Sequence, residues 1–202
     1  MRFKDRKPKR SGELQDAAVR ILTGEFRKNA VDPRTHHELE STVVHARELI
    51  SRDEDIETAG LMGWIARYDY VRGAYKSTED LWRREWVIRS RILGDEHPDT
   101  LRSMNNLAET LGAQGDLAGA REKQEKVLEI RRRILGDEHP DTSVSAWNLF
   151  STLLEMDDPT NAMAVLKNDL LWLMDRDPAT LGADQQQIRE MIIQLIGDKT
   201  EE

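Results

Sequence analysis

The sequence predicts an all-α fold, a right-handed α-solenoid of helix–turn–helix repeats with degenerate capping helices at its ends. Three observations lead to this prediction. The ten-residue segment RILGDEHPDT occurs at residues 91–100 and again at 133–142, an offset of 42 residues. Apolar residues between the two copies recur at intervals of three and four, which is the helical period. The composition, 34% charged and only 5% aromatic, also favours helices over sheets.

Charge is distributed unevenly along the 202 residues, whose formal net charge is −8. The first ten residues, MRFKDRKPKR, contain six Lys or Arg and one Asp, so the rest of the chain is more acidic than the whole. We expect residues 1–12 to form a disordered basic tail. The acidic body would repel a phosphate backbone, which argues against nucleic acid as its partner.

Several protein classes are excluded by what the sequence lacks. Without cysteine there is no disulfide, no thiolate catalysis and no Cys-ligated zinc. The chain has no apolar run near 18 residues and no apolar segment after its basic start. We therefore expect neither a transmembrane span nor a signal peptide, and predict a cytoplasmic protein that does not bind membranes.

The N-terminal part of the chain predicts two amphipathic helices, at residues 13–26 and 35–52. The dipeptide Asp32–Pro33 separates them, because proline favours a turn between helices. We interpret residues 13–56 as a degenerate helical pair that covers the N-terminal end of the repeats.

Three repeat units are predicted at residues 57–98, 99–140 and 141–183. In the central unit, a first helix is followed by a turn at Gly115–Asp116 and by a second helix. Gly73 takes the place of Gly115 in the preceding unit, whereas the third unit has Asp157–Asp158–Pro159 there. Residues 184–202 are interpreted as a C-terminal capping helix, over residues 184–196, and a tail.

The repeated RILGDEHPDT segment contains a histidine and carboxylates, which are residues that bind metals or transfer protons. The two copies are one repeat apart, however, roughly 10 Å or more at helix packing distances, so they cannot share an ion. The segment is better explained as a turn. Gly94 would end one helix and Pro98 would prevent its continuation, while Asp99 and Thr100 would cap the next helix. The same roles fall to the equivalent residues Gly136, Pro140, Asp141 and Thr142 in the second copy.

No other motif indicates catalysis. The histidines at positions 36, 37 and 45 do not form the i, i+4 pair that grips a metal on a helix. The sequence contains no G-x-S-x-G, H-E-x-x-H or G-x-x-x-x-G-K-[ST] motif. We therefore predict that the protein is not an enzyme and has no catalytic residue, no cofactor and no metal site.

The segment MNNLAETLGAQGDLAGAREKQEKVLEIRRRILGDEHPDT resembles a tetratricopeptide repeat (TPR) of the 42-residue kind found in kinesin light chains. Repeats of that kind also form the tails of STAND (NB-ARC-type) signalling proteins, and AVRILTGEF with the segments after it resembles the leader of those tails. The matching residues are Leu107, Ala108, Gly115, Ala120 and Pro140. The sequence departs from the family pattern at Asp69, Thr78 and Gln124, where an apolar, a small and an aromatic residue are usual.

This resemblance implies a concave surface, lined by the first helix of each repeat, that binds a peptide or protein. The positions that it places there are Trp64, Arg67, Tyr70, Arg102, Asn105, Asn106, Glu109, Trp147 and Asn148. Asn106 and Asn148 match asparagines that clamp an extended peptide, since an amide both donates and accepts hydrogen bonds. Arg67 and Arg102 are expected to meet a carboxylate of the ligand. The remaining tryptophans, Trp82, Trp86 and Trp172, are expected to lie in the core.

The function that the sequence predicts is that of a non-enzymatic protein–protein interaction module, an adaptor or sensor that binds a peptide or protein on its concave face. Two alternatives stay open. The first alternative is a regulatory or inhibitory subunit of an effector enzyme or STAND-type system. The second is a nucleic-acid-associated protein that uses its basic N-terminal arm. A homo-oligomer is a further expectation, because degenerate repeat ends can stack on each other.

Overall fold

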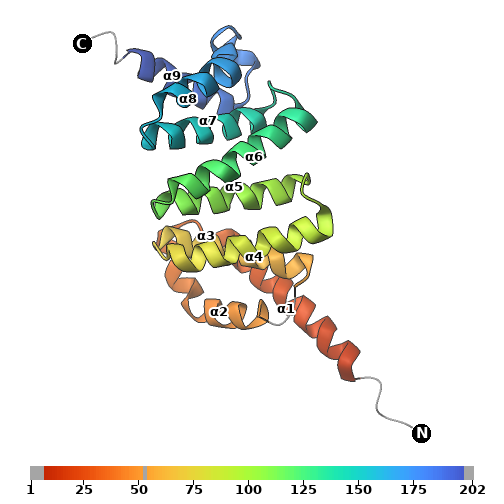
Figure 1. Cartoon of the computed structure of the whole chain (residues 1–202). Helices are drawn as coiled ribbons and strands as arrows, with labels where there is room; N and C mark the ends of the chain where they lie inside the picture. Colours follow the sequence, from red (N-terminus) through yellow and green to blue (C-terminus); the bar gives the residue numbers. More distant parts are fainter. Residues whose placement is uncertain (1–6, 52–53, 198–202) are drawn as a thin grey trace. The chain divides into compact units, whose positions relative to one another are not determined.

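The computed structural model describes residues 7–51 and 54–197. Over these residues the chain is helical throughout and contains no strand (Figure 1). Its helices are α1 (Lys7–Asn29), α2 (His36–Leu49), α3 (Ile56–Val71), α4 (Tyr75–Leu93), α5 (Pro98–Ala113), α6 (Leu117–Leu135), α7 (Pro140–Glu155), α8 (Pro159–Val165) and α9 (Ala183–Gly197). Short 3-10 turns lie at Pro33–Thr35, Leu171–Met174 and Pro178–Thr180, and a π turn at Leu166–Leu170. The predicted all-α repeat array is confirmed.

The chain divides into two compact units, Met1–Thr110 and Leu111–Glu202, called here unit 1 and unit 2. Part of the predicted basic tail, residues 1–6, lies outside the described residues, as do residues 52–53 and 198–202. Residues 7–12, which we assigned to the same tail, belong to α1, which begins at Lys7. Within the described segments, no helix is both long enough and apolar enough to cross a bilayer.

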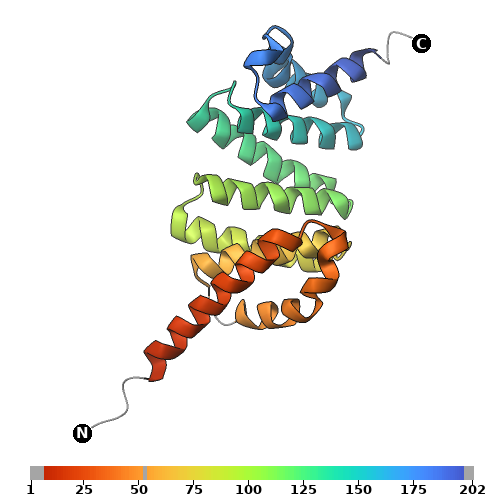
Figure 2. The same cartoon turned by 180° about the vertical axis from the view of Figure 1, so that it is seen from behind.

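Unit 1 is built around α3, which packs against α1, α2 and α4. Figure 2 shows α1 lying across α3. Phe26 of α1 meets Tyr68 of α3 edge to face, with ring centroids 6.1 Å apart. His36 of α2 lies 4.6 Å from the same ring, and its Nε2 is 3.0 Å from the carbonyl oxygen of Ala30. Because neighbours surround α3, its buried residues lie on all sides of the helix rather than on one stripe.

Asp69, one of the three departures from the repeat pattern, is buried on α3 and fully paired. Both of its carboxylate oxygens accept from Nη2 of Arg47, at 2.6 Å each. The hydroxyl of Ser77 donates to Oδ2, also at 2.6 Å. A second departure, Thr78, is buried as well, and its hydroxyl donates to the carbonyl oxygen of Ala74 at 3.0 Å. Polar side chains are accommodated at these positions because each has a hydrogen-bond partner.

The two RILGDEHPDT segments form turns between helices, and their glycines behave as expected. Gly94 and Gly136 follow α4 and α6 directly, and both have φ of +91°, a conformation that favours glycine. In the third repeat the position equivalent to Gly73 and Gly115 is occupied by Asp157, which keeps a positive φ of 56°. Aspartate tolerates this conformation better than most residues, so the turn survives the loss of glycine.

The capping residues of these turns differ from our prediction. Nδ1 of His97 accepts from the backbone N–H of Asp99 at 3.2 Å, and Nδ1 of His139 accepts from that of Asp141 at 3.1 Å. The caps are therefore the histidines, and the assignment of that role to the aspartates and threonines was wrong. The reason is that α5 and α7 begin at the prolines themselves. Proline is favoured as the first helical residue because it has no N–H to satisfy, so the cap is the residue before it, two positions before the predicted aspartate.

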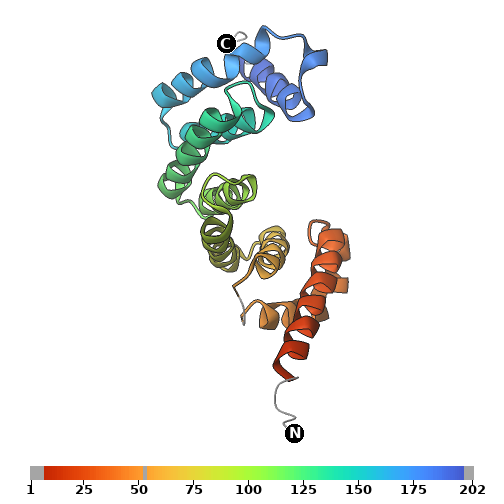
Figure 3. The same ribbon diagram turned by 90° about the vertical axis from the view of Figure 1, so that its right-hand side faces the viewer.

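Unit 2 has its core where α7 packs against α6, α8 and α9 (Figure 3). The predicted C-terminal helix is α9, and Ile188 and Ile192 on it are buried. The core also contains Leu149, Phe150, Leu153, Leu166, Leu170 and Leu173. The apolar period that predicted these helices thus corresponds to the faces that are removed from water.

Candidate functional site

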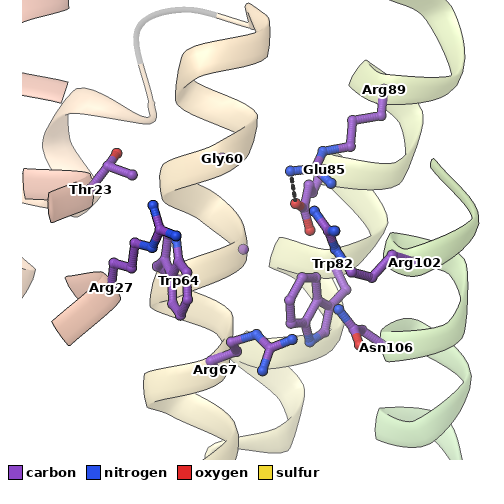
Figure 4. Close-up of a pocket in the computed structure, with 11 residues that line it drawn as sticks. Thr23, Arg27, Gly60, Trp64, Arg67, Trp82, Glu85, Arg89, Arg102 and Asn106 are labelled. Atoms are coloured by element: carbon purple, nitrogen blue, oxygen red, sulfur yellow. Dashed lines mark ion pairs between the residues drawn. The ribbon is translucent and has the colours of Figure 1, made fainter. Parts of the chain in front are cut away.

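A cavity of about 460 Å³ in unit 1, called here the arginine cavity, is bordered by α1, α3, α4 and α5 (Figure 4). It contains four of the predicted site residues. Its lining residues are Thr23, Arg27, Gly60, Gly63, Trp64, Arg67, Trp82, Glu85, Arg89, Arg102 and Asn106.

Four arginines, each from a different helix, give this cavity a positive charge in an otherwise acidic chain. Arg102 is paired with Asp99 at 2.7 Å. Arg67 lies over the ring of Trp64, 5.6 Å from its centroid, in a cation–π arrangement. In the described part of the chain, neither Arg27 nor Arg67 forms an ion pair with a carboxylate, so both guanidinium groups are available to bind an anion.

Glu85 is the single carboxylate among the lining residues, and only 2% of it is exposed. Its Oε1 accepts from Nη2 of Arg89 at 2.8 Å, whereas Oε2 makes no hydrogen bond within the described residues. Burial raises the pKa of Glu85 to about 7, although the charges of Arg89 and Arg102 act in the opposite direction. The carboxylate lies against Gly63 of α3, where a Cβ atom would be 2.7 Å from Oε1.

A second cavity, of about 240 Å³, adjoins the first and is called here the tyrosine cavity. It is lined by Val31, Arg67, Tyr70, Val71, Trp82, Asn106, Glu109 and Thr110. Tyr70 packs edge to face against Tyr75, with ring centroids 5.5 Å apart. Burial raises the pKa of Tyr70 to about 12, and the neighbouring Glu109 adds to the effect. Arg67, Trp82 and Asn106 border both cavities.

The structure brings together six of the predicted site residues in unit 1. Trp64, Arg67, Arg102 and Asn106 line the arginine cavity, and Arg67 and Asn106 also line the tyrosine cavity with Tyr70 and Glu109. Asn105 belongs to neither lining. It is half-buried, and its Oδ1 is enclosed without a hydrogen-bond partner in the described segments.

The two predicted site residues of unit 2 lie on α7. Trp147 lines a cavity of about 370 Å³ with residues of α7 and α9, namely Val144, Asp184, Gln187, Ile188 and Met191. Its ring is 5.3 Å from that of Phe150. Asn148 is half-buried and is not part of this lining.

Residue-by-residue sequence reasoning missed several residues of the unit 1 site. Trp82 is 4% exposed, in agreement with its predicted core position, yet it forms a wall of both cavities. Glu85 was not singled out, although the repeat frame contained a signal. One repeat later, Glu85 is replaced by Val127 and Gly63 by Asn105. In the third repeat the two positions hold Asp169 and Trp147, so only the first repeat places a carboxylate opposite a missing side chain.

Comparisons with known proteins agree with the repeat. The family model of the tetratricopeptide repeat matches residues 100–141. No curated protein sequence matches the chain. Among solved structures, the nearly identical TPR-like repeats assigned to a Podosopora anserina kinesin light chain are similar, with a TM-score of 0.72, 19% identity, and coverage of 92% of this chain and 90% of that chain.

Two further structures are also similar. A variant of the same Podosopora anserina repeats that carries one substitution has a TM-score of 0.70 and 18% identity, over 92% of this chain and 96% of that one. BtubC (BKLC) from P. vanneervenii has a TM-score of 0.61 and 17% identity, over 87% of this chain and 79% of that one. At these identities the likeness establishes the shared fold.

Proposed function

We propose that this tetratricopeptide repeat protein binds an extended acidic segment of another protein on the surface that α3 and α5 form in unit 1. Repeats of this family are generally protein-interaction modules. The observation that carries the proposal is the sharing of Arg67, Trp82 and Asn106 by two cavities of different chemistry. One cavity is cationic, and the other offers aromatic and aliphatic side chains.

The arginine cavity suits a carboxylate of the ligand. Arg27 and Arg67 have no ion-pair partner in the described residues, and a guanidinium can hold a carboxylate through two parallel hydrogen bonds. Arg102 is half-exposed beside them and already shares its charge with Asp99. A ligand carboxylate would therefore replace water around two guanidinium groups that form no ion pair in the described residues.

The tyrosine cavity suits an apolar side chain near that carboxylate. Val31, Tyr70 and Val71 supply apolar surface there, and pockets of this composition bind side chains by removing them from water. Asn106 borders both cavities, so its amide can donate to and accept from the ligand backbone between the two side chains. The ligand that fits both cavities is an extended peptide with an acidic residue near an apolar one.

We propose Trp147 and Asn148 on α7 as a separate partner-binding surface of unit 2. Trp147 supplies an aromatic wall to a cavity whose other walls include Val144, Ile188 and Met191. Aromatic residues in such positions often contribute strongly to binding. Asn148 is the residue of unit 2 that corresponds to Asn106 in the 42-residue frame.

The test is an array of fluorescein-labelled ten-residue peptides, in which acidic, basic and apolar positions are varied, measured against the full chain by fluorescence polarisation. Peptides that combine acidic and apolar residues should bind, more weakly as salt increases. Arg67→Ala should weaken that binding about tenfold, as expected for loss of one charge-assisted contact. The matched control is Arg83→Ala on α4, whose guanidinium pairs with Glu79 away from both cavities. Equal binding of basic peptides, or an unchanged Kd for Arg67→Ala, would contradict the proposal.

A further inference from the structure

We propose that the arginine cavity takes up a proton when it binds an anionic group, and that the carboxylate of Glu85 is the group that receives it. This inference rests on the proposed function only in requiring that the ligand be anionic. It adds that binding depends on pH through one residue inside the cavity.

The position of Glu85 is the first support. Its carboxylate is enclosed between Arg89, 2.8 Å from Oε1, and the bare Cα of Gly63. Because only 2% of Glu85 is exposed, the charge of this side chain stays inside the cavity rather than in bulk water. An anion bound to the cavity arginines would therefore add a second negative charge close to a first that water screens poorly.

The charged groups that act on Glu85 come from three of the four helices that border the cavity. Arg67 faces it from α3, Arg102 from α5 and Arg89 from its own helix α4, and all three favour the ionised form. Arg27 of α1 lines the same cavity. The carboxylate of Asp99 on α5 is engaged by Arg102 at 2.7 Å and lies 3.9 Å from Nη1 of Arg89.

Burial outweighs these guanidinium groups and raises the pKa of Glu85 to about 7. Near neutral pH, the free protein therefore contains both the ionised and the protonated form. A bound anion raises the pKa further, since like charges disfavour each other's ionised form and the anion occupies the guanidinium groups that stabilise Glu85. Protonation and anion binding must then favour each other by the same factor.

The direction of the pH effect follows from this linkage. Below pH 7 Glu85 is neutral, so the arginines face the ligand without an internal counter-charge and affinity is high. Above pH 7 the ionised carboxylate repels the ligand and affinity falls. Each unit by which the anion raises the pKa of Glu85 corresponds to a tenfold gain in affinity between the two limits.

The experiment is isothermal titration calorimetry of the full chain with two probes, sodium sulfate and an acetylated, amidated pentapeptide of four glutamates around a central leucine. Both probes keep a constant charge between pH 6 and 8, since their acidic groups titrate well below that range. Titrations at pH 7 in two buffers of different ionisation enthalpy give the number of protons taken up. We expect an uptake between zero and one proton and an affinity about three- to tenfold higher at pH 6 than at pH 8.

Two variants assign the proton. Glu85→Gln should bind at pH 8 about as tightly as the wild type at pH 6, with no proton uptake. Glu79→Gln, on the same helix but outside the cavity, should keep the wild-type pH dependence. None of the residues that line the cavity is a histidine. If a histidine elsewhere in the chain caused the pH dependence of binding, that dependence would persist in Glu85→Gln.

The outcomes separate the two proposals. Binding without proton uptake, or a Glu85→Gln variant that keeps the wild-type pH dependence, would overturn the role of Glu85. Failure of both probes to bind at any pH would instead contradict the proposed function. If circular dichroism shows that Glu85→Gln does not fold, the role of Glu85 is tested in the wild type instead. The glutamate carboxyl groups are then titrated and followed by carbon-13 NMR. One carboxyl must titrate near pH 7 and shift upward when sulfate is added, and the absence of such a signal would overturn the inference.

Discussion

Nη1 of Arg131 donates a hydrogen bond to the backbone carbonyl of Asp141 at 2.9 Å, and this bond joins the end of α6 to the first turn of α7. In unit 1, Arg89 makes the equivalent bond to the carbonyl of Asp99 at 3.1 Å, 42 residues earlier. Both arginines are buried, with 7% and 8% exposed. The same repeat position therefore connects one helical pair to the next in both units.

Removing this connection should destabilise unit 2. Arg131 also donates to the hydroxyl of Ser145 at 2.8 Å, so Arg131→Ala removes two hydrogen bonds of a buried charged group, although the carbonyl of Asp141 still accepts from Ser145 at 3.0 Å. We expect a loss of about 1–3 kcal/mol in the free energy of unfolding, measured by urea denaturation followed by circular dichroism. Lys126→Ala, at an exposed position of the same helix, should change it by less than about 0.5 kcal/mol. Equal stability of the two variants would show that the bond contributes nothing.

Gly63 is predicted to be required because of its neighbour Glu85. The methyl group in Gly63→Ala would approach Oε1 of Glu85 to 2.7 Å, so the carboxylate or α4 must shift. We expect the free energy of unfolding to fall by about 1–3 kcal/mol, the usual cost of overpacking. Gly60→Ala is the matched control, since a Cβ there meets nothing within 4 Å. It should be neutral or stabilising by up to about 1 kcal/mol, as alanine is the better helix former. A Gly63→Ala protein as stable as Gly60→Ala would contradict the close contact.

The buried carboxylate of Asp69 gives a prediction about paired replacement. Asp69→Leu restores the apolar residue that is usual at this position but removes the carboxylate that accepts from Arg47 and Ser77, and leaves Arg47 only its hydrogen bond to the Ser77 hydroxyl at 3.2 Å. Arg47 is about half-exposed, so water relieves part of the loss, and we expect a cost of about 1–3 kcal/mol. The double replacement Arg47→Leu with Asp69→Leu should recover most of that stability, because an apolar pair can substitute for a buried ion pair. Thermal and urea unfolding of both variants test this, and additive losses would exclude the coupling.

The two asparagines, one on the proposed surface of each unit, should matter for binding and not for stability. The double variant Asn106→Ala with Asn148→Ala should weaken peptide binding about tenfold at each unit's own surface, since each asparagine is proposed to bond the backbone of a peptide bound to its unit. The melting transition should shift by no more than a few degrees, because neither asparagine is fully buried. Polarisation and differential scanning calorimetry measure the two effects. Unchanged peptide affinity in the double variant would remove both residues from the binding surface.

The alternative of a basic arm also makes a measurable prediction. If peptide binding resides in unit 1, deleting residues 1–6 should leave the affinity for an acidic peptide unchanged within about twofold, because screened charges on a terminal segment act only over about a Debye length. The same deletion should weaken binding of a short duplex DNA if residues 1–6 contact phosphates. Loss of peptide binding on deletion would move the proposed site away from the two cavities.

The helices and turns could be predicted from the sequence because each depends on residues that are close together in the chain. Gly94 and Gly136 end helices through their own backbone freedom, and the apolar period identifies the buried face of α9. The caps were misassigned at His97 and His139 because a capping bond depends on where the helix begins. Once Pro98 and Pro140 are taken as the first helical residues, the same local reasoning gives the histidines.

The sequence by itself determined the 42-residue frame, the helical pairs and the turns between them, since each depends on residues a few positions apart. It also indicated Arg67, Arg102 and Asn106 through their places in that frame. Only the tertiary structure decided that Arg27, Glu85 and Arg89 join them, because these side chains come from helices far apart in sequence and meet through packing. A carboxylate on α4 becomes special only where α3 has no side chain to fill the space and where arginines of α3, α4 and α5 act on it. No local pattern encodes that convergence.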